Sequence, residues 1–236
     1  AENGNQILID GGPGDAVLAE LGSVLPFYDR TLDMIVSTHP DADHLNGLVE
    51  VLKRYRVGVV LETGVLKDTA RYDEWNRLVE EQHIPIMYAV AGERFDIDSD
   101  VSMKIISPTK SEKGLAPPKI NNTSIITRLD YNGVSFLFTG DVEAITERKL
   151  AFTSHDLDVD ILKVAHHGSK TSSSEEFLRR VMPAAAVISV GRDNRYGHPH
   201  PEVIDRLNGL GIPVYRTDLQ GTVAMRVFPD GRYEVK

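Results

Sequence analysis

One short segment, residues 38–44 with the sequence Thr-His-Pro-Asp-Ala-Asp-His, restricts the fold of this chain more than any other. It follows an apolar run at residues 34–36 and precedes apolar residues that recur at helical spacing from residue 45 to residue 52. The segment therefore predicts a buried strand that turns directly into a helix. His and Asp at this density are hard to explain by packing, so we interpret the turn as a site of chemistry. The alternative is a solvated turn with an N-cap aspartate.

The polar side chains of this segment are placed to converge on one point. His39 and Asp41 are two residues apart, as are Asp41 and Asp43, so a tightly turned loop would bring them together. Asp43 and His44 fall in the first turn of the expected helix, where free backbone N–H groups and the helix dipole favour anions. Imidazole and carboxylate groups are common metal ligands. The segment therefore predicts a metal site at the end of a strand.

Strand-like and helical patterns alternate through the first ninety residues. Short apolar runs, typical of buried strands, are separated by segments with apolar residues at helical spacing. The predicted strands are 6–9, 34–36, 57–61 and 86–89, and the predicted helices are 15–25, 45–54 and 69–82. This β-α-β-α-β order predicts an α/β layer with buried strands.

The pattern changes after residue 93, where hairpins become frequent. The clearest hairpin joins strands 123–130 and 134–138 through Asn132-Gly133, a pair that suits a two-residue turn. The other predicted elements are strands 93–98, 101–106, 159–164, 185–190 and 214–215, helices 142–152, 173–181 and 202–210, and a last hairpin around 229–231. Residues 107–120 read as a polar loop. Ser173 and Glu176 have the spacing of a capping box.

The composition limits the class of protein. The 236 residues suit one large domain or two small ones, and we treat residues 1–236 as a single domain. Because the chain has no Cys, disulfides and thiolate zinc sites are excluded. No apolar run approaches the ~20 residues of a membrane span and no signal peptide opens the chain, so we expect a soluble chain without membrane insertion. The net charge of −9 argues against a generally basic nucleic-acid-binding surface.

Side chains of ligand type recur wherever a predicted strand ends. Six of the eight His lie in such segments, and the other two, His83 and His155, look like surface or loop residues. In α/β sheets, sites form at the edge where strands give way to loops. The residues at these positions are Asp10, His39, Asp41, Asp43, His44, Asp141, His166, His167, His198 and His200. Asp10 could orient a ligand histidine from outside the ligand set; equally, it could be an ordinary turn aspartate.

Three motifs in this order resemble the metallo-β-lactamase superfamily: residues 38–44, Thr-Gly-Asp at 139–141, and His-His-Gly-Ser-Lys-Thr-Ser at 166–172. More narrowly, segments 162–172 and 196–201 resemble the extracellular β-lactamase-like domain at the C-terminus of ComEC competence proteins, which are DNA-uptake channels. The shared pattern covers nearly the whole chain. Such domains usually begin with an earlier strand that carries Gly-Gln-Gly-Asp. This strand is absent here, so we expect the first strand pair to be incomplete.

The resemblance implies an α/β fold of the αββα sandwich type, with a two-metal site at its edge. The metal ligands that it implies are His39, Asp41, Asp43, His44, Asp141 and His167. In the superfamily the first motif is His-x-His-x-Asp-His, and Asp41 stands at its second His. A carboxylate is a harder ligand than imidazole. We therefore expect two divalent ions, with Mn²⁺ favoured and Mg²⁺ or Zn²⁺ as alternatives.

The motifs leave two positions of this ligand set open. The branch that resembles phosphorylcholine esterases uses His167 as the last ligand, with His166 facing the phosphate. The general superfamily pattern points to His198 instead, and we favour His167. The middle His motif of the superfamily has no clear match, and Asn121-Asn122 occupies its segment. We therefore expect the first metal to be weakly held.

The resemblance also suggests roles in metal-assisted phosphodiester hydrolysis. The candidates for orienting the nucleophile, neutralising the phosphate or protonating the leaving oxygen are Asp43, Lys163, His166 and His198. Lys163 could equally be a strand-edge lysine that faces solvent. The candidates for binding the substrate are Asn122, Lys170 and Tyr196. Tyr196 could stack on a base, although a loop tyrosine is more often a packing residue.

The implied activity is a Mn²⁺-preferring nuclease that degrades the non-imported DNA strand during natural transformation. The implied partners are DNA, single-stranded by preference, and a membrane channel domain of the same polypeptide. The chain would then be a soluble domain at the extracellular face of the bacterial cell membrane. Two alternatives remain open: a small-molecule phosphodiesterase of the same fold, and a non-catalytic DNA-binding module.

Overall fold

The structure is a computed structural model that describes residues 4–153 and 157–236. His155 lies outside the described residues. The chain divides into two compact units. The first unit consists of Ala1–Ala91 and Ser107–Ile125, and the second of Gly92–Ile106 and Ile126–Lys236. The assignment of residues 1–236 to a single domain stays a prediction.

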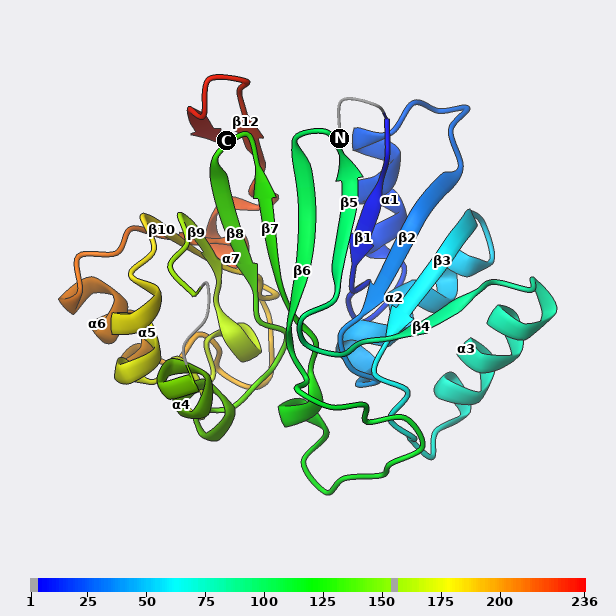
Figure 1. The fold of residues 1–236 in the computed structure, drawn as a ribbon, viewed down its shortest axis with the longest axis horizontal. Coiled ribbons are helices and arrows are strands. Elements are labelled where there is room, and N and C mark those ends of the chain that lie inside the picture. The colour runs from blue at the N-terminus through cyan, green and yellow to red at the C-terminus, as the bar shows by residue number, and fades with distance from the viewer. Residues whose placement is uncertain (1–3, 154–156) are drawn as a thin grey trace. The chain divides into compact units, whose positions relative to one another are not determined.

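The first unit contains a four-stranded parallel sheet in the order β1-β2-β3-β4. Its strands are β1 (Ile7–Ile9), β2 (Thr31–Ser37), β3 (Arg56–Glu62) and β4 (Ile86–Tyr88), and its helices are α1 (Ala16–Val24), α2 (Ala42–Leu52) and α3 (Ala70–Glu81) (Figure 1). These elements confirm the predicted β-α-β-α-β order. All strands are parallel, because each returns to the sheet through a helix.

Apolar residues of β2, β3 and the three helices form the core of the first unit. Trp75 of α3 has no exposed surface, and its indole N–H donates to Glu62 Oε2 at 3.0 Å. Burial raises the pKa of Glu62, although the Trp75 hydrogen bond opposes this shift. The helices therefore pack on the sheet through apolar contacts, with the one polar atom of the indole paired.

The second unit contains a seven-stranded mixed sheet in the order β11-β10-β9-β8-β7-β6-β5. Its strands are β5 (Arg94–Asp98), β6 (Val101–Ser107), β7 (Ile126–Tyr131), β8 (Val134–Phe138), β9 (Ile161–Lys163), β10 (Ala185–Ile188) and β11 (Val214–Arg216). The pairs β8/β9, β9/β10 and β10/β11 are parallel, whereas β5/β6 and β7/β8 are antiparallel hairpins. The hairpins were predicted from their turn residues, and the sheet confirms them.

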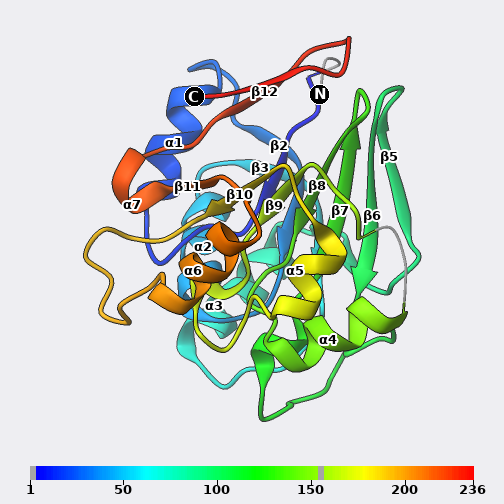
Figure 2. The same cartoon turned by 90° about the vertical axis from the view of Figure 1, so that its left-hand side faces the viewer.

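The two faces of this second sheet are covered by different elements. The helices α4 (Ala144–Thr153), α5 (Glu175–Val181) and α6 (Pro201–Gly209) bury one face, where residues such as Leu137, Leu162 and Phe177 meet (Figure 1 and Figure 2). On the other face, Val134, Ile161 and Ala185 pack with residues of the terminal hairpin, β12 (Met225–Val227) and β13 (Tyr233–Val235). The period-two alternation along β8, β9 and β10 decides which side chain joins which cluster.

The structure corrects one predicted detail and adds others. The capping box of Ser173 and Glu176 is wrong, because α5 begins at Glu175 with Ser174 at its N-cap and with no side-chain cap. The buried Glu147 of α4 instead accepts the backbone N–H groups of Ser173 (2.6 Å) and Ser174 (2.7 Å). Burial raises the pKa of Glu147, although these two hydrogen bonds oppose the shift.

Two short helices were not predicted from the sequence. They are a 3₁₀ helix at Ile120–Thr123 and α7 (Thr217–Gln220). The 3₁₀ helix delays the start of β7 to Ile126, three residues later than expected. Within the described ranges, no helix combines the length and the apolar character that crossing a membrane requires.

Candidate functional site

The polar residues of the first unit lie where neighbouring parallel strands end. Asp10 follows β1, and Thr38 and His39 follow β2. Because β1 and β2 are parallel, their carboxyl ends share one edge of the sheet. Asp10 has a positive φ of 59°, a conformation that Asp tolerates better than most residues. The turn after β1 therefore directs its carboxylate toward the motif after β2.

The carboxylate of Asp10 organises this first cluster, which we define as Asp10, His39, Asp41, Asp43 and His44. Its Oδ2 atom lies 2.7 Å from Nδ1 of His44. Thr38 donates its backbone N–H to Oδ1 at 2.9 Å and its hydroxyl to Oδ2 at 2.8 Å. Burial raises the pKa of Asp10, but the charge of His44 and these hydrogen bonds outweigh it and lower the pKa overall. Asp10 is therefore held as a carboxylate that fixes the ring of His44.

This contact defines which ring atom of His44 would bind a metal. Asp10 engages Nδ1, so Nε2 is the atom left for a metal, as in carboxylate–histidine–metal arrangements. His39 is oriented in a similar way, since its Nδ1 lies 3.0 Å from the Thr38 hydroxyl. The two imidazole rings are buried, with centroids 4.2 Å apart. Both histidines are fixed by neighbours that the sequence places at strand ends.

Two glycines allow the turn after β1 to contact the backbone of α2. A Cβ atom on Gly47 would lie 1.8 Å from the carbonyl oxygen of Gly11, which no side chain can tolerate. Backbone bonds join the two segments, from Gly11 N to His44 O at 2.8 Å and from Gly47 N to Gly12 O at 2.9 Å. This close approach sets the distance between Asp10 and His44.

Asp41 takes a different role from its neighbours in the motif. It stands at the N-cap position of α2, but its side chain makes no capping hydrogen bond to the helix. One carboxylate oxygen instead forms an ion pair with Lys67, from the loop between β3 and α3. The other oxygen lies 3.9 Å from Nε2 of His39. Asp43 lies in the first turn of α2, where the helix dipole favours its charge.

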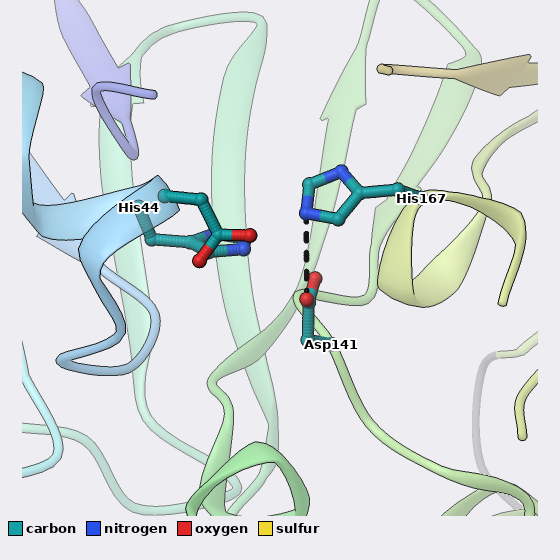
Figure 3. A group of neighbouring side chains, drawn as sticks. His44, Asp141 and His167 are labelled. Atoms are coloured by element: carbon teal, nitrogen blue, oxygen red, sulfur yellow. Dashed lines mark ion pairs between the residues drawn. The ribbon is translucent and has the colours of Figure 1, made fainter. Parts of the chain in front are cut away.

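The second cluster, which we define as Asp141, His166 and His167, belongs to the second unit. Asp141 follows β8 and is 2% exposed, and the two histidines follow β9, which is parallel to β8. Nε2 of His167 lies 3.4 Å from Asp141 Oδ2, and the ring points toward that carboxylate (Figure 3). Nε2 of His166 lies 3.9 Å from the same oxygen. The adjacent strand ends therefore bring an imidazole and a buried carboxylate together.

Both histidines of the second cluster are fixed through their Nδ1 atoms. Nδ1 of His167 lies 2.7 Å from the carbonyl oxygen of Ser189, just beyond β10. Nδ1 of His166 lies 3.2 Å from the hydroxyl of Thr171. A carbonyl oxygen can only accept, so Nδ1 of His167 carries the proton and Nε2 presents its lone pair to a metal.

The backbone of this segment is unusual. His166 and His167 have φ of 51° and 53°, and Gly168 continues the left-handed run at 79°. A Cβ atom on Gly168 would lie 2.5 Å from Cβ of Pro199, so this position also requires glycine for space. Consecutive non-glycine residues in this conformation are strained and occur mostly at functional sites.

The loop after β10 places His198 beside the second cluster. Its ring centroid is 5.7 Å from that of His166 and 5.2 Å from that of His200. Asn194 fixes its backbone, accepting from His198 N at 2.9 Å and donating to His198 O at 2.8 Å. Burial, together with the neighbouring His166 and His200, lowers the pKa of His198 to about 4. At neutral pH the ring is therefore uncharged and offers a lone pair.

The remaining candidates fall at different places. Lys163 ends β9, and its Nζ atom is buried with no hydrogen-bond partner among the residues that the structure describes. Tyr196 is 66% exposed and stacks on His198 with ring centroids 5.7 Å apart. Lys170 is exposed. Asn122 lies in the 3₁₀ helix of the first unit.

Several contributing residues escaped the sequence analysis. They are Thr38, Lys67, Thr171, Ser189 and Asn194. Thr38 and Thr171 adjoin the motifs, and their hydroxyl groups were the available signal. Lys67 and Asn194 stand alone in loops, where a sequence gives no reason to prefer them to other polar residues.

The contact between Asp10 and His44 leads to a first prediction. Asp10→Asn keeps the shape but removes the charge, so the ring of His44 loses the partner that fixes it and raises its basicity. We expect the affinity for Mn²⁺ to fall about 10- to 100-fold. Isothermal titration calorimetry measures the change, with Asp68→Asn, at an exposed position of the same unit, as the control. Unchanged affinity in Asp10→Asn would show that Asp10 plays no part in binding.

The chain matches the family model described as the metallo-beta-lactamase superfamily over residues 1–192. ComE operon protein 3 of Bacillus subtilis is 32% identical over 198 residues, which is 84% of this chain and 25% of that protein. Recombination protein 2 of Haemophilus influenzae is 34% identical over 240 residues, which is 100% of this chain and 28% of that protein. The chain therefore spans about a quarter of the length of the curated relatives that it matches.

Solved structures show the same fold at low sequence identity. The metallo-beta-lactamase fold protein YhfI of Bacillus subtilis gives a TM-score of 0.55 at 13% identity, covering 89% of this chain and 83% of that one. A putative metal-dependent hydrolase of Parabacteroides distasonis gives 0.52 at 16% identity, covering 89% and 84%. Together with the family match, these likenesses confirm the predicted fold class.

Proposed function

The chain belongs to the metallo-β-lactamase superfamily, and from this premise we propose that it hydrolyses phosphodiester bonds with the help of divalent metal ions. More specifically, we propose a nuclease that degrades the non-imported DNA strand during natural transformation. The names of two relatives, ComE operon protein 3 and Competence protein ComA, support a role in competence. The chain would act as one domain of a larger membrane protein, at the extracellular face of the cell membrane.

The pairing of His167 with Asp141 is the observation that carries this proposal. Both side chains are fixed before any ligand arrives, one by the Ser189 carbonyl and the other by burial. In the first cluster, Asp43 and His44 are placed at the start of α2 by the same kind of contacts. Imidazole Nε2 atoms and carboxylate oxygens are a donor set that fits a divalent ion. We propose that both clusters supply ligands to the metal.

The donor types favour a hard or intermediate ion. Two carboxylates and two imidazoles, from Asp43, Asp141, His44 and His167, match Mn²⁺ better than an all-imidazole or thiolate set would. We propose Mn²⁺ as the native ion, with Mg²⁺ and Zn²⁺ as alternatives. When bound, such an ion polarises the phosphoryl oxygen and makes water a nucleophile at neutral pH.

The residues of the chain would handle the charges and the proton. The buried ammonium of Lys163 has no hydrogen-bond partner among the described residues, and such a group is costly unless it is paired. A phosphate oxygen would satisfy it. His166, held at Nδ1 by Thr171, is our candidate to deliver a proton to the leaving oxygen. His198 is uncharged at neutral pH, so it fits an acceptor or an alternative ligand better than a proton donor.

A direct assay separates the three readings of the site. Labelled single- and double-stranded DNA and a small phosphodiester would be incubated with the protein and Mn²⁺, Mg²⁺ or Zn²⁺, with EDTA as a control. We expect Mn²⁺-dependent cutting of DNA, lost in Asp43→Ala. Turnover of the small ester alone would favour a small-molecule phosphodiesterase. DNA retention without cutting by the folded, metal-loaded protein would favour a binding module.

Tyr196 gives a second prediction, about the choice of substrate. Its exposed ring stacks on His198 and leaves one face for an unpaired base, and such stacking contributes about 1–3 kcal/mol per base. We expect Tyr196→Ala to raise KM for a single-stranded oligonucleotide about 5- to 150-fold, and Tyr196→Phe to leave it unchanged. An oligonucleotide with abasic sugars should be cut equally by both variants.

The control for this experiment is Phe152→Ala, because Phe152 is another exposed aromatic residue of the second unit. It should leave KM unchanged for both substrates. If Tyr196→Ala affected the abasic and the normal oligonucleotide equally, Tyr196 would act on the loop and not on the base.

A further inference from the structure

We propose that the ammonium group of Lys67 takes the place of one of the two metal ions expected in this fold, so that the chain binds a single divalent ion. The replaced position is the one that the His39 side of the first cluster would serve. This inference rests on the proposed metal-dependent function and specifies how many ions that function uses.

Three departures from the superfamily pattern fall on this one metal position. The second His of the first motif is Asp41. The middle His motif has no clear match, and Asn121-Asn122 occupies its segment. Lys67 pairs with Asp41 from a different loop. Each change alone would weaken a metal site, and together they replace neutral ligands and a cation by a carboxylate and an ammonium.

The electrostatics explain why these changes belong together. A neutral imidazole at position 41 would not attract an ammonium group, whereas a carboxylate attracts it strongly at contact distance. Once Lys67 neutralises Asp41, that carboxylate has less charge left for a metal ion. The ammonium has three donors and so can also serve other acceptors at this edge. The Asp41 oxygen that does not contact Lys67 lies 3.9 Å from His39 Nε2, so the ion pair stands beside the expected ligand.

The loop that carries Lys67 is braced on both sides. Leu66 N–H donates to the carbonyl of Leu115 at 2.7 Å, and Thr69 N–H donates to the carbonyl of Lys67 at 3.2 Å. The carbonyl of Gly64 accepts from Gly114 N–H at 2.9 Å. The Lys67 side chain is 24% exposed, far less than a free surface lysine. The position of the ammonium is therefore set by the fold, as a substitute for a bound ion requires.

Metal stoichiometry tests the inference without any assay of activity. The full chain would be dialysed against saturating Mn²⁺ and its metal content measured, together with the electron paramagnetic resonance spectrum. We expect one ion per chain and the six-line signal of isolated Mn²⁺. Lys67→Met should bind a second, weaker ion and show the spectrum of a coupled pair, because Asp41 is released. Lys67→Arg keeps the charge and should remain at one ion.

Two ions in the wild-type chain would overturn the inference, even if Lys67→Met failed to fold. One ion in a folded Lys67→Met variant at saturating Mn²⁺ would also overturn it, because Lys67 would not be what excludes the second ion. The count is independent of hydrolysis. A chain with one ion that cuts no phosphodiester would keep this inference and refute the proposed function. A chain with two ions that cuts DNA would do the reverse.

Discussion

Asp141→Asn is expected to reduce metal-dependent hydrolysis by about a thousandfold or more. Asp141 is buried at the end of β8, with its carboxylate 3.4 Å from Nε2 of His167. The amide keeps the shape but loses the negative charge, and stabilisation of charge by a metal site amounts to several kcal/mol. Since each 1.36 kcal/mol is about a tenfold change in rate, the loss of one charged ligand reaches this magnitude. Initial rates with Mn²⁺ and a labelled oligonucleotide measure it.

The matched control for this variant is Asp193→Asn, an exposed carboxylate in the loop of the same unit that carries His198. It should keep wild-type rates. Circular dichroism should show that Asp141→Asn retains the fold, so that the loss is assigned to chemistry. A folded Asp141→Asn variant with more than a tenth of the wild-type rate would exclude Asp141 from the metal site.

Gly47→Ala is expected to cause the largest loss of stability among single methyl additions near the site. The added Cβ would meet the Gly11 carbonyl oxygen at 1.8 Å and its carbon at 2.5 Å. Both obstacles are backbone atoms, so the strand turn and α2 must separate. Overpacking typically costs about 1–3 kcal/mol and occasionally more, and we expect the upper end. The corresponding fall in melting temperature is about 6–12 °C for a chain of this size.

The control for this prediction is Gly22→Ala, which also adds one methyl group within a helix of the first unit. Gly22 lies in α1, and a Cβ atom added there would meet nothing outside its own helix within 4 Å, so there is no clash. Replacing a helical glycine by alanine should stabilise the protein by about 0.5–1 kcal/mol. Differential scanning calorimetry of both variants would contradict the account if Gly47→Ala melted within about 2 °C of the wild type. Gly47→Ala should also weaken Mn²⁺ binding, because Asp10 moves away from His44.

Most of the elements of the fold were predictable from the sequence. Short apolar runs marked β2, β3, β9 and β10, and Asn132-Gly133 marked the hairpin of β7 and β8. These signals are local: periodicity and turn chemistry act within a few residues. The Ser173–Glu176 capping box failed because a distant carboxylate, that of Glu147, takes its place. The chain contains no local sign of that contact.

The candidate site divides in the same way between what local sequence reveals and what it does not. The His and Asp residues cluster in short motifs and were found, and so was Asp10 at a strand end. Lys67 and Asn194 act through contacts with residues 26 and four positions away, from loops with no periodicity. The left-handed backbone at His166 and His167 also has no signature in side-chain pattern, apart from the following Gly168. Only the folded backbone shows these features.

The most direct test of the central claim is a metal titration of hydrolysis. Protein stripped of metal would be mixed with a labelled single-stranded oligonucleotide, and cleavage would be followed as Mn²⁺ is added, for the wild type and for Asp141→Asn. We predict no cleavage without metal, saturable cleavage by the wild type, and none above background by the variant. Cleavage by the metal-free wild type, or equal cleavage by the two proteins at saturating Mn²⁺, would contradict a metal-dependent phosphodiesterase built on Asp141.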